Sequence, residues 1–587
     1  MMSVTGKAKD VAEAREALDG IFSAIAYLAG QGLPLRRREE KTSNLQRLLD
    51  QSERTCPALK TWRKRKQTFT SPEIQNEILE LMASAIVRQI ANSVREDVFA
   101  VMADETRDSA GTEQVAICLR SVNKQLEVEE QLIGLYSVES TTALVLSTVI
   151  KDALLRIELD LKQLRGQCYD GAANMSGKFK GVQALIKQEE PRAVFVHCTA
   201  HRLNLAVQDC MDGVRPLCDT IQETGRMIGF FRDSPKRLSC LIHFGADKSL
   251  RPLCPTRWTC SEPALASVIN NYTAVLSSLE AIADDPSTRP DQASTASGHA
   301  RRMQSFDFFF GLSLALHLLR MTTPVMKSVQ GSQQTLAANL QLVDVLHSAV
   351  SGQRSRFDSF YASTVGKAEE LGVSPPSLKR VIRPPRRLDD GSEPYRPQTP
   401  EDHYRPLYLL AVDRLCAALG ERYGSGEGRG AAVTDERRVS QAESALLTAN
   451  ADDLSATAAF YQLDEGRLAL HCQMLQDVCR DEGIPLGSLA DVVSALRRPH
   501  LAQLLPECVG LLRLVLTAPA TTCTAERSFS QLRRLKNWLR SNMSQARLNH
   551  AAVCAVYAEQ LHALDRQALM REFATRTPQR VNVFGWG

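Results

Sequence analysis

Apolar residues recur at helical spacing through the first part of the chain. The stretch "AREALDGIFSAIAYLAGQGLPL" carries them on one helical face and stops at Gly32 and Pro34. "SPEIQNEILELMASAIVRQIANSV" repeats the pattern, with Ser71 as a candidate N-cap and Pro72 directly behind it. Residues 1–96 are therefore predicted to form an N-terminal helical region.

The apolar pattern then shortens and alternates, which is typical of strands. The first three predicted strands are 97–106, 113–122 and 126–138, joined by the turns "RDSAGT" and "NKQ". A helix, a strand within "LKQLRGQCYDGAANMSG", a second helix and a strand at 193–198 follow. The order βββαβαβα predicts an α/β fold with a mixed sheet and flanking helices. We take 97–260 as the first part of this core.

Residues 261–494 return to helical patterns such as "FDFFFGLSLALHLLRMTTPVM". Two polar breaks interrupt them, near 283–300 and, rich in Pro, Arg and Asp, near 374–406. Both breaks are expected to be disordered loops, and the whole region is interpreted as a helical insertion. The last segment, 495–575, is again amphipathic and is predicted to be helical.

Composition narrows the class of protein. The chain has 587 residues, so about three or four folding units are expected rather than one core. Its net charge of +4 does not by itself indicate nucleic-acid binding, which would need local basic patches. The 15 scattered cysteines favour reduced thiols in the cytosol or nucleus. No signal peptide and no membrane span are expected.

Two aspartates stand where predicted strands end. Asp104 closes "VMAD" in the first strand, and Asp170 follows the fourth strand in "GQCYDGAANMSG". Each could simply form a turn, because Asp and Asp-Gly are common turn residues. In a βββαβ unit, however, the first and fourth strands can lie side by side. The two carboxylates could then share Mg²⁺ or Mn²⁺ for phosphodiester cleavage. That mechanism requires a third acidic ligand.

Two further short motifs leave alternatives open. Cys198 and His201 form C-x-x-H in "VHCTAHRLNLAV", but a structural zinc site needs four ligands, so zinc is not expected here. A structural role for this pair is favoured. Arg257 and Trp258 in "CPTRWTC" could bind a phosphate and stack on a base, or Trp258 could pack at a domain boundary.

Near the C-terminus, "TAERSFSQLRRL" predicts the start of an amphipathic helix. On local grounds Glu526 is an acid in the first turn, a place that the helix dipole favours. An apolar stripe suited to burial in the core or against a partner is formed by Phe529, Leu532, Leu535, Trp538 and Leu539.

These segments, in this order, resemble the hAT transposase superfamily. More closely, they resemble transposase-derived animal proteins of the zinc-finger MYM-type-like and TTF-type zinc-finger kind. The stretches that carry the resemblance are "IAYLAGQGLPLRRREE", "FAVMADETRDSAGTEQVAICLRSV", "GQCYDGAANMSGKFKGVQALI", "VHCTAHRLNLAVQD", "CPTRW" and "TAERSFSQLRRLKNWLRSNMSQARLNHAAV". The resemblance spans about residues 20–570 and is weakest through the insertion. Such relatives usually carry an N-terminal zinc finger, which this chain is expected to lack.

The resemblance implies an RNase H-like core interrupted by a long all-helical insertion, with a helical C-terminal dimerisation region. It implies that Asp104, Asp170 and Glu526 are the catalytic, metal-binding acids. It also implies that Trp258, beside Arg257, handles a flipped base.

Two functions follow as hypotheses. One is a Mg²⁺- or Mn²⁺-dependent DNA transposase. The other, which we favour, is a nuclear protein without robust catalysis that forms a homodimer or higher homo-oligomer and binds DNA or chromatin partners.

Overall fold

The structure of the chain is a computed structural model. It describes residues 4–37, 39, 42–247, 250–253, 261–331, 334–378, 397–424, 434–537, 540 and 542–586. The chain divides into two compact units. The first combines residues 1–198 with 432–587, and the second consists of residues 199–431.

The first unit contains a mixed five-stranded sheet. Its strands are β1 (Phe99–Arg107), β2 (Glu113–Val122), β3 (Val128–Val138), β4 (Leu164–Tyr169) and β5 (Val194–His197). They lie in the order β3-β2-β1-β4-β5. The β1–β2 and β2–β3 pairs are antiparallel, whereas β1–β4 and β4–β5 are parallel. The predicted α/β class and mixed sheet are confirmed, and the first and fourth strands are neighbours.

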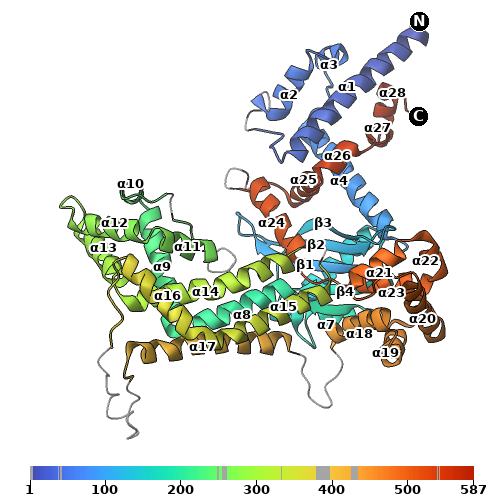
Figure 1. The fold of residues 1–587 in the computed structure, drawn as a ribbon. Coiled ribbons are helices and arrows are strands. Elements are labelled where there is room, and N and C mark those ends of the chain that lie inside the picture. The colour runs from blue at the N-terminus through green and yellow to red at the C-terminus, as the bar shows by residue number, and fades with distance from the viewer. Residues whose placement is uncertain are drawn as a thin grey trace. The chain divides into compact units, whose positions relative to one another are not determined.

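Helices from both ends of the chain pack against this sheet. α23 (Pro506–Thr517) contacts β2 and β4, and α24 (Cys523–Leu535) contacts β1, β2 and β3 (Figure 1). α25 (Gln545–Val556) packs on β3 and on α4 (Pro72–Val94). α5 (Ala143–Arg156) packs on β3 and on α7 (Val182–Glu189). The C-terminal segment is therefore helical, as predicted, and completes the core begun by residues 99–197.

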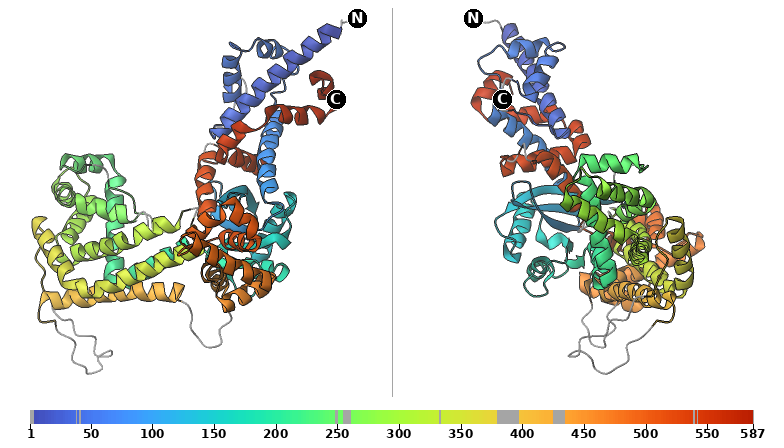
Figure 2. Two further views of the ribbon diagram at one scale, coloured as in Figure 1. Left: turned by 45° about the vertical axis from the view of Figure 1, so that its right-hand side comes forward. Right: turned by 90° about the vertical axis from the view of Figure 1, so that its left-hand side faces the viewer.

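The two ends of the chain also meet in one group of helices (Figures 1 and 2). α1 (Val4–Gly30) contacts α25 and the three helices that follow it. Those three are α26 (Ala558–Ala563), α27 (Arg566–Thr575) and α28 (Pro578–Phe584). The Arg15 guanidinium donates to the Phe584 carbonyl at 2.7 Å, which fixes α28 beside α1. The predicted N-terminal helical region is thus one half of a terminal bundle.

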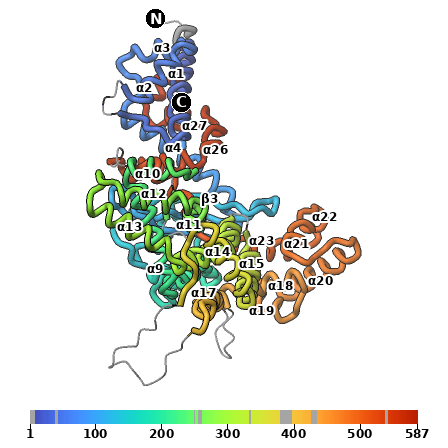
Figure 3. The backbone as a smooth tube through the Cα atoms, turned by 60° about the vertical axis from the view of Figure 1, so that its left-hand side comes forward, coloured from blue at the N-terminus to red at the C-terminus, as the bar shows by residue number. Residues whose placement is uncertain are grey.

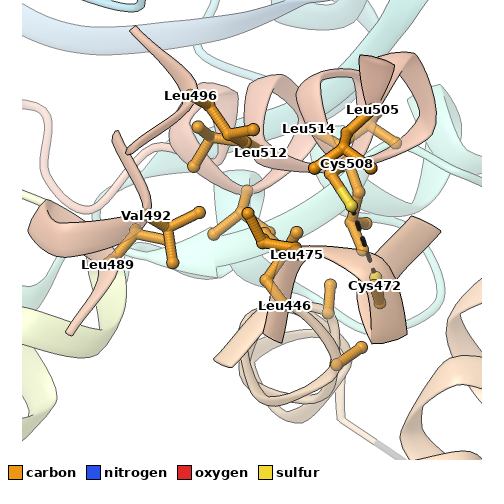
Figure 4. Packing of buried hydrophobic residues seen from close by; sticks show 14 of the residues in the cluster. Leu446, Cys472, Leu475, Leu489, Val492, Leu496, Leu505, Cys508, Leu512 and Leu514 are labelled. Carbon is orange, nitrogen blue, oxygen red and sulfur yellow. Dashed lines mark hydrogen bonds between the residues drawn. The ribbon is translucent and has the colours of Figure 1, made fainter. Parts of the chain in front are cut away.

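The remaining elements of the first unit are short. They are α2 (Asn44–Ser52), α3 (Pro57–Trp62), η2 (Leu161–Gln163), α6 (Ala173–Ser176), α18 (Asp435–Thr448), α19 (Ala451–Tyr461), α20 (Glu465–Asp481), α21 (Leu489–Leu496) and α22 (Pro499–Leu504). α18 to α23 share a buried apolar cluster with the β2–β3 hairpin. Figure 4 shows its centre, where the Cys472 and Cys508 sulfurs lie 3.7 Å apart among leucines.

The second unit is helical throughout its described residues (Figure 3). Its elements are α8 (Thr199–Gly213), α9 (Arg215–Arg232), α10 (Pro235–His243), α11 (Ser261–Asn270), α12 (Tyr272–Asp284), α13 (Pro290–Met303), α14 (Phe306–Val329), α15 (Leu336–Ser351), η4 (Gly352–Arg356), α16 (Phe357–Glu370) and α17 (Pro400–Tyr423). α8 packs on α14 and α17, which explains why this unit begins at 199. It ends before α18, whose apolar face packs on α23 and β5. Its bounds therefore differ from the predicted 261–494.

The predicted loop near 283–300 is wrong for most of its length, because α13 occupies 290–303. Ala296, Ala300 and Met303 are buried on one face of this helix, so a few apolar residues pack it although most of its residues are polar. Of the predicted loop at 374–406, residues 379–396 lie outside the described residues, and α17 begins at Pro400.

One helix among the described residues, α14, has the length and composition of a membrane span. Its most apolar window has a mean hydropathy of 1.3 and is 67% buried inside the structure, as the core helices of soluble proteins also are. The expected absence of a membrane span stays a prediction.

Candidate acid site at the sheet edge

The parallel pairing of β1 with β4 aligns the two predicted aspartates. Met102 is opposite Cys168, and Asp104 and Asp170 each lie two residues further along. Because side chains alternate along a strand, both carboxylates belong to the face of Ala100 and Gly166. That face is closely covered, since a Cβ on Gly166 would lie 2.6 Å from Cδ of Pro519 in the segment leading to α24. The first and fourth strands are therefore neighbours, as predicted, and the sharing of a metal by Asp104 and Asp170 stays a prediction.

The first turn of α24 brings the third acid to the same edge. The Glu526 amide donates to the Thr522 carbonyl at 3.1 Å, which begins the helix. Burial holds the pKa of the half-buried Asp104 well above its ordinary value, and the charges of Glu526 and Asp170 raise it further. Asp170 and Glu526 are therefore both close enough to Asp104 for their charges to act on it. Within the described residues, no three His, Cys, Asp or Glu side chains are yet close enough to hold a metal ion.

A fourth carboxylate, Glu105, flanks the site. Burial raises its pKa to about 7, with further contributions from the charges of Asp170 and Glu113. Asn174 of α6 donates to its Oε1 at 3.3 Å. Glu105 was not predicted as a site residue, although it stands beside Asp104 near the end of a predicted strand.

A buried ion pair fixes the start of α24 on the sheet. Arg120 of β2 and Glu130 of β3 lie 2.6 Å apart, with 1% and 3% of their side chains exposed. Arg120 also donates to the Leu516 carbonyl at 3.1 Å, and the Thr524 hydroxyl donates to Glu130. Thr524 is two residues from Glu526, so this network sets the position of the third acid.

A second buried pair fixes the other end of α24. Lys536 Nζ lies 2.6 Å from Oδ2 of Asp108, which is in the β1–β2 turn and fully buried. The Ala110 and Thr112 amides donate to the other Asp108 oxygen. Burial acts to raise the pKa of Asp108, but the hydrogen bonds from Lys536 and the two amides outweigh it and lower the pKa.

The C-x-x-H motif divides between the two units. Cys198 is buried in the first unit, where the Thr522 amide and hydroxyl donate to its sulfur at 3.3 and 3.4 Å. Hydrogen bonds from the Cys168 and Cys523 thiols lower the Cys198 pKa against the effect of burial. These contacts tie β4 and β5 to the start of α24. His201 belongs to the first turn of α8 in the second unit and is half-buried.

Two other predictions have different outcomes. Phe529, Leu532 and Leu535 of α24 are all buried within the chain, so this part of the stripe belongs to the core. Trp538 and Leu539 lie outside the described residues. Arg257 and Trp258, predicted to contact DNA, lie outside the described residues.

Comparisons with known proteins agree with this architecture. Residues 3–181 match the family DUF4371, described as "ZMYM1/FAM200, RNase-like domain", and residues 491–559 match the hAT family C-terminal dimerisation region. The human "52 kDa repressor of the inhibitor of the protein kinase" is 24% identical over 94% of this chain and 75% of its own length. The mouse protein of that name is 23% identical over 94% of this chain and 76% of its own length. The chain thus carries an RNase-like domain of the DUF4371 family at residues 3–181 and a hAT C-terminal dimerisation region at residues 491–559.

Proposed function

We propose that this chain is a nuclear protein that dimerises through its C-terminal region and holds nucleic acid at the acid edge of its sheet. Its main role is binding rather than catalytic turnover. The similarity to proteins named as a repressor, over 94% of the chain, supports a regulatory role of this kind.

The observation that supports nucleic-acid binding is an exposed loop with an aromatic residue, at 177–181, beside the acid edge. Phe179 is 85% exposed and stands between the exposed residues Lys178 and Lys180. The loop is closed tightly at its base, where the Gly181 amide donates to the Gly177 carbonyl at 3.1 Å. An aromatic ring flanked by lysines offers a stacking surface for a base and charges for phosphates.

The same loop lies next to Asp170 along the chain and in space. The Ser176 hydroxyl, one residue before the loop, donates to the Gly171 carbonyl at 3.1 Å. A base stacked on Phe179 would therefore bring its strand toward the carboxylates. This arrangement supports a single-stranded or unpaired segment as the ligand.

Binding of a labelled single-stranded oligonucleotide, followed by fluorescence anisotropy, tests this function. Phe179→Ala should weaken binding by about tenfold, since stacking on an aromatic contributes about 1–3 kcal/mol per base. Leu155→Ala is the matched control, because Leu155 is 74% exposed on α5, outside the loop. Wild-type protein that fails to bind, or equal losses in both variants, would refute the proposal.

Dimerisation is proposed to use the outer surface of α22, within the segment that matches the hAT dimerisation region. Leu504 at its end is 48% exposed. A groove of about 540 Å³ lies beside α22, and its lining includes Leu126, Leu496 and Val509. A second copy of this chain is the proposed occupant.

Light scattering at micromolar concentration tests the dimer. Wild-type protein should have the mass of two chains, and Leu504→Glu should shift it toward one. Leu155→Glu introduces the same charge at an exposed position outside the matched region and should leave the mass unchanged. A monomeric wild type would overturn this part of the proposal.

Metal-dependent strand cleavage is the second candidate, favoured by the convergence of Asp104, Asp170 and Glu526. Carboxylate oxygens are the ligands that Mg²⁺ and Mn²⁺ prefer, and a cation would offset both the burial of Asp104 and the neighbouring charges, which together raise its pKa. Such an ion would supply an activated water and stabilise a leaving oxygen. A Mn²⁺-dependent nicking assay should show activity that Asp170→Asn abolishes, and equal activity in the two proteins would exclude this candidate.

A further inference from the structure

Three arginines from separate segments line one cavity in the first unit. Arg36 follows α1, Arg540 lies between α24 and α25, and Arg547 is in the first turn of α25. The cavity has a volume of about 370 Å³, and Asn76 of α4 and Ser544 complete its polar wall. It is distinct from the acid edge, none of whose carboxylates lines it.

The cavity concentrates positive charge. Burial lowers the pKa of Arg547 to about 10, and the charges of Arg36 and Arg540 add to this effect. Burial also lowers the pKa of Arg540. Arg547 remains protonated at neutral pH, because even its lowered pKa is far above 7.

Two of the three arginines have no acidic partner among the described residues, since neither Arg540 nor Arg547 forms an ion pair there. Arg36 donates to the amide oxygen of Asn76, and its charge also acts on Glu73, an exposed acid in the first turn of α4. Such a concentration of like charge costs stability unless an anion is bound.

The hydrogen-bonding geometry is suited to an oxyanion. Arg540 is oriented by donating to the Gly32 carbonyl at 3.0 Å, which leaves other N–H groups for a ligand. Ser544 is the N-cap of α25, but its side chain makes no capping hydrogen bond. The first amides of this 12-residue helix therefore add to the positive potential of the arginines. Guanidinium groups bind phosphate oxygens in pairs, which favours phosphate over a simple halide.

We propose that this three-arginine pocket (Arg36, Arg540 and Arg547) binds a backbone phosphate of DNA. The proposal rests on the nucleic-acid binding inferred above and adds a second contact to it. α24 connects the two sites, with Glu526 in its first turn and the pocket just beyond its end. A helix of 13 residues spans about 20 Å, or about six steps of a DNA strand. Arg533 and Arg534 are exposed in its last turn, along the path between the sites.

Salt-dependent binding of the full chain to a labelled duplex with a single-stranded end tests the pocket. Arg547→Gln should weaken binding about tenfold and should reduce the slope of log affinity against log salt by about 1 across about 50–200 mM salt. Arg547→Lys should recover part of the affinity, since lysine restores the positive charge but not the paired N–H donors of a guanidinium group. Arg156→Gln is the control, because Arg156 is exposed on α5 and pairs with Asp152.

Thermal unfolding of the same proteins provides an independent readout. Removing an uncompensated charge should leave the Arg547→Gln variant at least as stable as the wild type, so weaker binding cannot come from misfolding. Inorganic pyrophosphate should raise the unfolding temperature of the wild type and not that of the variant.

The outcomes separate this inference from the proposed function. If wild-type protein binds DNA and Arg547→Gln binds it equally, with the same salt slope, the pocket assignment is overturned and the function stands. If wild-type protein binds no DNA while pyrophosphate still stabilises it alone, the pocket serves a free phosphate ligand and the DNA assignment is overturned. If neither ligand acts, both are refuted.

Discussion

Glu105 makes the stability of the sheet edge depend on pH in a direction that can be worked out. Its pKa is raised to about 7 in the folded protein from an ordinary value of 4.5. Between these values the folded state binds more protons than the unfolded state, so the free energy of unfolding falls as pH rises. The full shift corresponds to about 3 kcal/mol, and about 2 kcal/mol remains after a discount for solvent screening at this half-buried position.

Glu105→Gln removes this titration and keeps an oxygen to accept from Asn174. The variant should therefore be about 2 kcal/mol more stable than the wild type at pH 8, and the difference should vanish near pH 4.5. Hydrogen exchange of β1 and β4 peptides, measured in urea from pH 5 to 8 (about the range of the Glu105 titration) and corrected for intrinsic rates, reports this local stability. Glu139→Gln, at an exposed position after β3, should show no such trend. A difference that stays constant with pH, or a less stable variant at pH 8, would refute the reasoning.

Two further predictions concern the elements that position Glu526. Lys536→Met should destabilise the first unit by about 3 kcal/mol, because Asp108 keeps a buried charge without its cation. Adding Asp108→Asn should recover part of this loss in thermal unfolding. If the double variant instead loses as much stability as the two single variants together, the ion pair would be contradicted. Gly166→Ala should cost about 1–3 kcal/mol, because its Cβ would lie 2.6 Å from Pro519 and 2.9 Å from Ala100. Unchanged stability in chemical unfolding would show that this close approach relaxes freely.

Local sequence patterns predicted the sheet edge well. Strand periodicity and turn residues located β1 to β5, and the βββαβ order placed the first strand beside the fourth. From that adjacency the closeness of Asp104 and Asp170 followed. Glu526 is different, because its local signal is only that of a helix start. Its place at the site depends on a helix that returns to the sheet after the second unit, and only the family resemblance indicated this.

Other features depended on contacts that sequence patterns do not reveal. The second unit begins at residue 199 because α8 packs on helices far along the chain, and no change in composition marks that point. α13 buries only a few of its residues and is otherwise polar, so its composition suggested a loop. The three-arginine pocket combines residues from both ends of the chain, each of which is ordinary in its own segment.

The contacts around α24 show that the two family-matched regions are parts of one structure. Glu130 and Asp108, which hold the two ends of this helix, belong to the RNase-like region at 3–181. Glu526 and Lys536 belong to the dimerisation region at 491–559. Either region alone would leave a buried charge of these networks without its partner, which proteins tolerate poorly. The acid edge therefore depends on the C-terminal region for its third carboxylate and for the helix that positions it.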